Sequence, residues 1–135
     1  TLTALRGEFA AATSAISMGI AVRRSLGKLG FDPSTALYAN SSCPDEVNRK
    51  RPDWDLLLGG SSGSSFNLGG LAGLPAVGKT GIKACVSHVP EGACLFVLCA
   101  SHCGVDSQGT VGGVVRVGQG GKKSTCCGAA CAALT

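Results

Sequence analysis

The longest apolar run in the chain extends from Ala93 to Ala100 (ACLFVLCA) and limits what the chain can fold into. The run is about as long as one buried strand and far shorter than the roughly 20 residues of a membrane helix. Within it, Leu95–Cys99 is continuously apolar, which is typical of a strand covered on both faces. The sequence therefore predicts a central strand over these residues and no membrane span.

The N-terminal segment, residues 1–30, is predicted to be helical. Between Thr3 and about Lys28, apolar side chains recur at spacings of three and four residues: Leu5, Phe9, Ala12, Ile16 and Ile20. This spacing places them on one face of an amphipathic helix that ends near Gly27 or Gly30. We expect this face to pack against the core.

Short strand signals separate the helix-like stretches. Ala36–Ala39 and Val114–Val117 are predicted strands, and Ser124 and Thr125 precede a predicted helix that starts at Cys126. Strands that alternate with helices favour an α/β fold, with a mostly parallel central sheet flanked by helices.

Length and composition restrict the class of protein further. A chain of 135 residues suits a single domain over 1–135, in which 35–134 form the core that holds the candidate site. The net charge is +4, but basic residues are not interleaved with aromatic ones, which argues against nucleic-acid binding. Eight cysteines are too few for a small secreted disulfide scaffold. We therefore expect reduced thiols in an intracellular compartment.

Residues Gly73–Thr80 (GLPAVGKT) match the phosphate-loop pattern G-x-x-x-x-G-K-S/T letter for letter. A phosphate loop follows a buried strand and opens a long helix. Here Gly- and Ser-rich sequence, including Gly59–Ser65 as a flexible loop or an excised insertion, precedes the match, and Pro90 closes the segment after it. A phosphate-loop nucleotide binder is therefore the least favoured alternative.

Cysteine and histidine side chains follow two of the predicted strands and open the last helix. Cys43 follows the first strand, His102 follows the central strand, and the Cys126-Cys127 pair starts the helix. The carboxyl ends of parallel strands meet at one edge of a sheet, so we expect Cys43 and His102 to converge. A helix N-terminus favours a thiolate there. Two thiolates and an imidazole suit zinc with a vacant fourth position, as in catalytic sites.

The same residue types also have simpler interpretations. The cysteines at positions 85, 94, 99, 103 and 131 are expected to be small core residues, and a histidine at a strand end is often only hydrogen-bonded. The chain has no C-x-x-C pair that would mark a metal site. From the residues alone, zinc binding and an ordinary buried cluster both stay open.

A zinc ion held by two thiolates needs a helper group, because the thiolates cancel its charge and weaken its pull on bound water. Asp45, two residues after Cys43, is expected to accept a hydrogen bond from that water and to orient it. A bidentate arginine would keep the carboxylate in its charged form, and Arg116 and Arg49 are both candidates. Asp45 and Arg49 lie at i and i+4, so they could instead form an ordinary surface pair.

Six short strings occur along the chain in this order: CPDEVN, FNLGGLAGLP-x-x-GKTG, HVPEG, SHCGV, GGVVRVGQ and CCGAA. Together, over roughly residues 35–133, they resemble the limiting-carbon-dioxide-inducible protein B and C family of algae and bacteria. Members of that family are similar to β-carbonic anhydrases. The resemblance implies an α/β core, a zinc held by Cys, His and Cys, an Asp–Arg dyad and a dimeric assembly.

Carried over to this chain, the resemblance implies Cys43, His102 and Cys127 as the zinc ligands. Cys127 is preferred to Cys126 because it stands directly before Gly128. Position 103, beside the histidine, is a cysteine where the family pattern leads us to expect an aliphatic residue, so it adds a rival thiol.

The resemblance also implies a catalytic dyad, formed by Asp45 with Arg116 or Arg49. The implied reaction is the reversible hydration of carbon dioxide to bicarbonate by zinc-bound hydroxide. The alternative is a catalytically silent zinc-binding partner subunit in carbon-dioxide concentration or recapture. The implied assembly is a homodimer or a heteromer within the family, in the chloroplast stroma of an alga or the cytoplasm of a bacterium.

Overall fold

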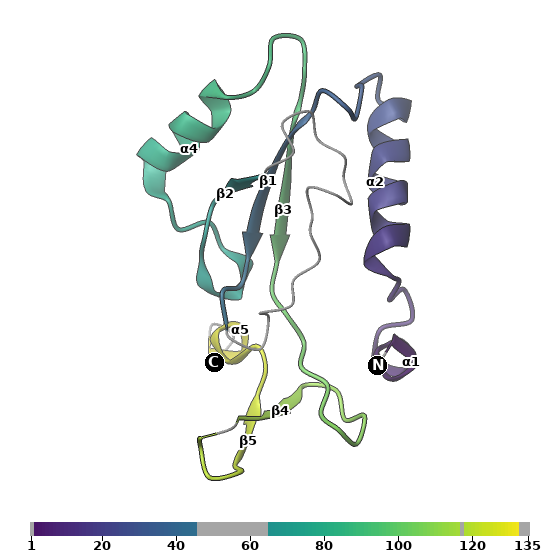
Figure 1. Ribbon diagram of the computed structural model, residues 1–135, viewed down its shortest axis with the longest axis vertical. Coiled ribbons are helices and arrows are strands. Elements are labelled where there is room, and N and C mark those ends of the chain that lie inside the picture. The colour runs from purple at the N-terminus through teal and green to yellow at the C-terminus, as the bar shows by residue number, and fades with distance from the viewer. Residues whose placement is uncertain (1, 46–64, 117, 133–135) are drawn as a thin grey trace.

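A computed structural model describes residues 2–45, 65–116 and 118–132 (Figure 1). In chain order, the elements are α1 (Leu2–Glu8), α2 (Ala15–Lys28), β1 (Leu37–Ser42), β2 (Phe66–Asn67), the 3₁₀ turn η2 (Leu71–Gly73), α4 (Gly78–Ser87), β3 (Leu95–Ala100), β4 (Gly113–Val115), β5 (Lys123–Thr125) and α5 (Gly128–Ala132). A parallel sheet flanked by helices confirms the predicted α/β class. Of the predicted loop Gly59–Ser65, only Ser65 lies within the described residues.

The three parallel strands are arranged in the order β2-β1-β3. The register pairs Leu37 with Leu95 at one end and Ser42 with Ala100 at the other. The prediction that Leu95–Cys99 is the central strand is therefore wrong, because β1 is central and β3 has no further strand beside it among the described residues. Val97 is 40% exposed, so the apolar run is not covered along its whole length.

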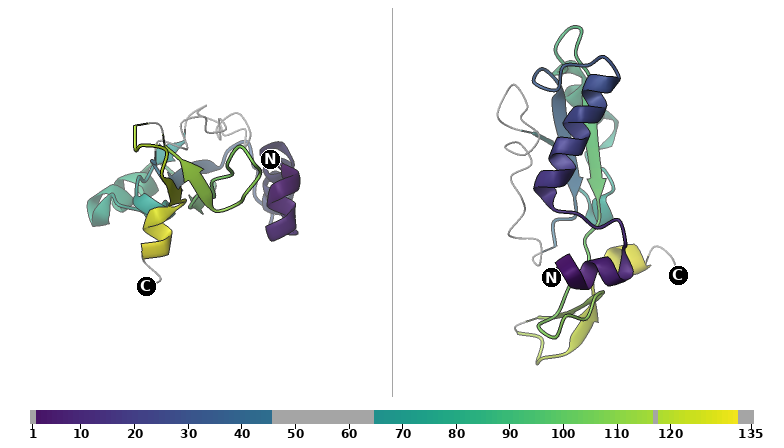
Figure 2. Two further views of the ribbon diagram at one scale, coloured as in Figure 1. Left: turned by 90° about the horizontal axis from the view of Figure 1, so that it is seen from below. Right: turned by 90° about the vertical axis from the view of Figure 1, so that its right-hand side faces the viewer.

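Two small apolar cores lie on opposite faces of the sheet, beneath the two longer helices (Figures 1 and 2). Tyr38 of β1 packs with Leu26 of α2 on one face. Its neighbour Ala39 packs with Leu68 and with Cys85 of α4 on the other face. This alternation follows from strand geometry, in which successive side chains point to opposite faces.

Leu68 is only 2% exposed and is one of the largest fully buried side chains, so truncating it should leave a cavity. We expect Leu68→Ala to lower the free energy of unfolding by about 2–5 kcal/mol. Leu74→Ala, at a side chain that is 66% exposed, should change it by less than about 0.5 kcal/mol. Equal losses for the two variants in urea denaturation would contradict this assignment of the core.

The N-terminal segment departs from the single predicted helix. The helix breaks between Glu8 and Ala15, and α2 restarts at Ser14, whose Oγ accepts a hydrogen bond from the Ser17 backbone N–H at 3.1 Å. The predicted core face is also wrong, because Phe9, Ile16 and Ile20 are 55–65% exposed. The contact with the sheet is made instead by Val22 and Leu26, nearer the C-terminal end of α2.

The strands β4 and β5 form an antiparallel hairpin beyond the carboxyl end of the sheet (Figure 1). Ser124 and Thr125, predicted to precede a helix directly, pair instead with Val114 and Gly113. The last helix therefore starts at Gly128 rather than at Cys126.

A loop beside this hairpin is held by one carboxylate. Asp106 Oδ1 accepts backbone hydrogen bonds from Gln108 at 3.0 Å and Thr110 at 2.8 Å, and Lys123 Nζ donates to Oδ2 at 2.9 Å. The hydrogen bond from Lys123, aided by the two backbone donors, lowers the pKa of Asp106 to about 2. The ionised carboxylate thus ties the loop to β5.

This lowered pKa predicts a pH dependence of stability. The Asp106 carboxyl has a usual pKa of 3.8, so the stabilisation is complete above about pH 4 and is lost as the pH falls towards about 2. Thermal midpoints measured over this range should fall more steeply for the wild-type protein than for Asp106→Asn. Parallel pH profiles for the two proteins would contradict the prediction.

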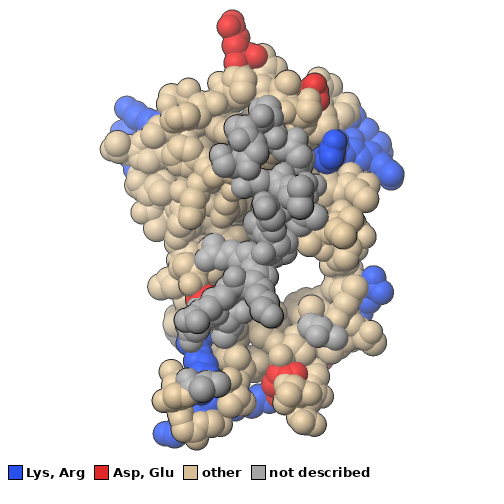
Figure 3. Space-filling model, viewed as in Figure 1, with Lys and Arg blue, Asp and Glu red and all other residues tan. Residues whose placement is uncertain are grey.

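The basic side chains do not gather at one place on the face drawn in Figure 3. On the face drawn in Figure 3, basic side chains lie in separate groups over α2, α4 and the β4–β5 hairpin. Within the described residues, no helix has both the length and the apolar character needed to cross a bilayer.

Candidate metal centre

Two of the candidate ligands are positioned by the carboxyl ends of adjacent strands. Cys43 directly follows β1, and its backbone N–H donates to the Ala100 carbonyl at 3.1 Å. His102 stands two residues beyond Ala100, the last residue of β3. The register that pairs Ser42 with Ala100 therefore brings Cys43 and His102 to the same edge, as the parallel sheet led us to expect.

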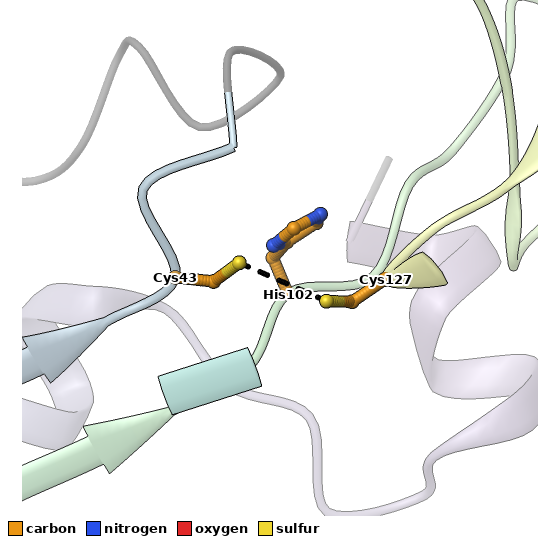
Figure 4. Close-up of side chains that lie close together, drawn as sticks. All are labelled: Cys43, His102 and Cys127. Atoms are coloured by element: carbon orange, nitrogen blue, oxygen red, sulfur yellow. Dashed lines mark hydrogen bonds between the residues drawn. The ribbon is translucent and has the colours of Figure 1, made fainter. Parts of the chain in front are cut away.

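The third candidate ligand is Cys127, directly before α5 (Figure 4). Its Sγ lies 3.7 Å from Cys43 Sγ, and one ligand atom from each of Cys43, His102 and Cys127 lies within 4.8 Å of the others. Two sulfur ligands of a tetrahedral zinc, each at about 2.3 Å from the metal, stand about 3.8 Å apart. The separation of the two sulfurs therefore matches that geometry.

The adjacent cysteine, Cys126, is not part of this group. Its side chain packs against Gly104, where an added methyl group would lie 3.0 Å from the Cys126 Cβ. Its backbone N–H donates to the Gly112 carbonyl at 3.1 Å, which fixes the chain before Cys127. Cys103, the rival thiol beside His102, is exposed and outside the group.

The two neighbouring thiols also differ in acidity. Burial raises the pKa of the Cys126 thiol, and the negative charge of Asp45 raises it further. Burial also acts to raise the pKa of Cys127, but hydrogen bonds from the Ala130 backbone N–H, the Cys43 thiol and further backbone donors outweigh it, so the pKa is lowered. The chain thus stabilises a thiolate at Cys127, which is the form that binds a metal.

The imidazole of His102 is buried without the partners that such a group normally has. Its side chain is 7% exposed, and neither Nδ1 nor Nε2 has a hydrogen-bond partner among the described residues. The nearest carboxylate oxygen, Asp45 Oδ2, is 3.7 Å from Nε2, beyond hydrogen-bond distance. Buried polar groups are normally paired, and a metal ion bound by one ring nitrogen would give that nitrogen a partner. The donor set therefore fits zinc.

A carboxylate and a guanidinium lie beside the three ligands. Arg116, just after β4, donates from Nη2 to Asp45 Oδ2 at 2.9 Å. Of the two arginines proposed from the sequence, the structure brings Arg116 to Asp45, whereas Arg49 lies outside the described residues. The pair is only partly exposed, so solvent screens it less than it screens a surface pair.

Sequence reasoning missed the backbone donors that surround Cys127. The N–H groups of Ala129, Ala130 and His102 all contribute to its lowered pKa. The small residues after Cys127 were the available signal, since they let the first turn of a helix approach a sulfur closely. The donor from His102 follows only from the tertiary fold.

The expected roles of the remaining cysteines are partly wrong. All eight cysteines lie within the described residues, and none of them forms a disulfide there. Of the five predicted to be core residues, Cys85 is buried and Cys94 is partly buried, but Cys99, Cys103 and Cys131 are exposed. The exposure of these three cysteines reflects their positions. Cys99 lies in β3 at the edge of the sheet, Cys103 lies in the loop beyond β3, and Cys131 lies in the short α5.

Residues 12–135 match the profile of a family described as limiting CO2-inducible proteins B/C beta carbonic anhydrases. The chain belongs to this family. Three crystal structures of one limiting CO2-inducible protein B homologue, PtLCIB4, are similar to it. Against PtLCIB4 itself the TM-score is 0.74 at 36% identity, with 98% of this chain and 54% of that chain covered.

Two PtLCIB4 mutants give comparable values. A histidine-to-alanine mutant matches with a TM-score of 0.75 at 36% identity, covering 98% of this chain and 54% of the other. A serine-to-arginine mutant matches with a TM-score of 0.71 at 34% identity, covering 98% and 55%. This limiting CO2-inducible B/C chain thus spans about half the length of its solved relatives. No functionally curated protein matches it significantly.

In this member of the limiting CO2-inducible B/C family, the phosphate-loop pattern has only part of the surroundings of a phosphate loop. Gly78 opens helix α4, but the pattern is preceded by the two-residue strand β2 and the short turn η2 rather than by a long buried strand. Gly73, the first glycine of the pattern, is itself buried against the end of β3. Gly73 therefore makes a packing contact with β3 where the first glycine of a phosphate loop would lie near a phosphate.

Proposed function

We propose that the protein is a zinc-dependent carbonic anhydrase that reversibly hydrates carbon dioxide to bicarbonate. The observation that carries the proposal is the buried imidazole of His102, which has no hydrogen-bond partner among the described residues and lies beside two thiols whose sulfurs are 3.7 Å apart. This donor set occurs in a chain whose family is described as beta carbonic anhydrases. Zinc bound there would supply a Lewis acid that lowers the pKa of water.

The chain offers three ligands to the ion: Cys43, His102 and Cys127. Three protein ligands leave one tetrahedral position for water, which is the pattern of catalytic rather than structural zinc sites. Asp45 Oδ2 is engaged by Arg116, which supports an open site rather than one closed by a fourth, carboxylate ligand.

In this proposal, Asp45 and Arg116 help to activate the bound water, because two thiolate ligands weaken the pull of the zinc ion on it. The Asp45 carboxylate accepts a hydrogen bond from the attacking water and turns its lone pair towards carbon dioxide. The Arg116 guanidinium fixes that carboxylate through the 2.9 Å hydrogen bond. Its positive charge also favours the bicarbonate anion at the site.

A catalytically silent partner subunit is the second candidate, and one observation is compatible with it. The cluster of Cys43, His102 and Cys127 is sufficient to hold an ion whether or not the site turns over substrate. In either candidate the ligand thiols must be reduced, which favours a reducing compartment.

Metal analysis combined with stopped-flow hydration assays tests the proposal. We expect about one zinc per chain and carbon-dioxide hydration that disappears when a chelator removes the metal. Zinc without hydration between about pH 6 and pH 9 would select the silent partner subunit. A protein that takes up no zinc when reduced and supplied with the ion would refute both candidates.

A further inference from the structure

The glycine-rich segment that mimics a phosphate loop lies against the metal centre. Its 3₁₀ turn, η2, is next to β1, β3 and α5, the elements that carry the three candidate ligands. The proposed reaction assigns no role to this segment. Its position suggests that it controls how those elements meet.

Gly73 is the point of closest approach. Its backbone has φ +82°, and a methyl group placed on it would lie 2.4–2.7 Å from the backbone C, O and N atoms of Ala100. Contacts this short with backbone atoms cannot be relieved by a side-chain rotation. A larger residue at position 73 must therefore displace either the segment or the end of β3.

Both sides of this contact are tied to the central strand β1. The Leu68 backbone N–H donates to the Asn40 carbonyl at 2.8 Å, and the fully buried Ser41 hydroxyl donates to the Gly69 carbonyl. The end of β3 pairs with β1 through Ala100 and Ser42. A clash at Gly73 must therefore shift one side relative to β1, and a shift of the end of β3 changes the positions of the ligands.

A movement of Ala100 would displace two of the three ligands directly. The Ala100 carbonyl accepts the hydrogen bond from the Cys43 backbone at 3.1 Å, and His102 is two residues further along. A shift there would separate Cys43 and His102 from Cys127, which is carried by a different element.

We propose that Gly73 is a positioning residue. Because it has no side chain, the Ala100 backbone can contact it directly, and this contact sets the distance between the end of β3 and the rest of the Cys43, His102 and Cys127 group. The inference rests on the proposed metal site and adds a structural determinant of its affinity. It also accounts for the phosphate-loop match, because the first glycine of that pattern is needed for close packing.

The test compares Gly73→Ala with Gly78→Ala. Gly78 belongs to the same segment and also has a positive φ, +64°, but a methyl group there would meet nothing within 4 Å. Both variants therefore carry the backbone cost of a non-glycine residue in the left-handed region. Only Gly73→Ala adds the clash with Ala100.

Zinc affinity is measured by chelator competition, the ligand field by the absorption spectrum of the cobalt-substituted protein, and folding by the thermal midpoint of the metal-free protein. We expect both variants to lose thermal stability. Only Gly73→Ala should also bind zinc about 10–100-fold more weakly and alter the cobalt spectrum. Equal affinity and an equal spectrum for the two variants would overturn the inference.

The outcomes separate this inference from the proposed function. Failure of the wild-type protein to bind either metal would refute the metal site and the inference with it, whereas normal binding by both wild type and Gly73→Ala would refute only the inference. If Gly73→Ala does not fold, Ser41→Ala replaces it, since it removes one of the segment's hydrogen bonds to β1 without adding a clash. Weaker zinc binding by Ser41→Ala supports the role of the segment, and unchanged binding overturns it.

Discussion

Replacing Cys127 with alanine is expected to reduce the zinc content of the purified protein from about one ion per chain to less than about a tenth of that. The substitution removes the Cys127 thiol, whose pKa the surrounding backbone donors help to lower. It leaves Cys43 and His102, and two ligands are too few for a tetrahedral site. Metal analysis after dialysis against a weak chelator measures the loss.

Cys126→Ala is the matched control. Cys126 and Cys127 are neighbours and are equally buried, each 5% exposed, but Cys126 packs against Gly104 outside the cluster. This variant should lose some stability and keep its zinc. Zinc loss in Cys126→Ala with retention in Cys127→Ala would exchange the roles of the two residues, and loss in neither would refute the site.

Replacing Asp45 with alanine is expected to lower kcat for carbon-dioxide hydration by about 100-fold or more while leaving the zinc content unchanged. Asp45 is not one of the three clustered ligands, so the ion should stay bound. The carboxylate that orients the water would be missing. Stopped-flow assays on metal-loaded protein, with zinc measured in the same samples, separate the two effects.

Asp106→Ala serves as the control for this second prediction. It removes a carboxylate from an ion pair of the same 2.9 Å length, outside the cluster. Hydration should proceed at the wild-type rate. Arg116→Ala should reproduce much of the Asp45→Ala defect, because it removes the group that fixes the carboxylate. Wild-type turnover by Asp45→Ala would refute the dyad.

The class of fold could be predicted from the sequence because the signals for it are local. Short apolar strands such as Leu95–Ala100, separated by helical stretches, are sufficient to indicate a parallel sheet. The place of a strand within the sheet depends on its partners. The apolar run therefore did not indicate that β1 is the one strand beside β3 in the described part of the chain. The break before α2 had a local signal, the capping residue Ser14, but the regular apolar spacing concealed it.

Parts of the candidate site could be anticipated for the same reason. Cys43 and His102 each follow a predicted parallel strand, and such strands end at a shared edge. The choice between Arg116 and Arg49 could not be made from spacing, because Arg116 reaches Asp45 across 71 positions of sequence. The directions of the Cys126 and Cys127 side chains depend on contacts with Gly104 and Gly112, which no local pattern encodes.

The proposed centre joins cysteines that are 84 positions apart in the chain, and this separation governs when metal can be captured during biosynthesis. A nascent chain that has exposed only Cys43 holds a single thiol of the site. The proposed ion could be secured only after Cys127 has left the ribosome and the β4–β5 hairpin before it has formed. Zinc loading would then follow the synthesis of every element from β1 to β5, and it would act as a check that these elements have assembled.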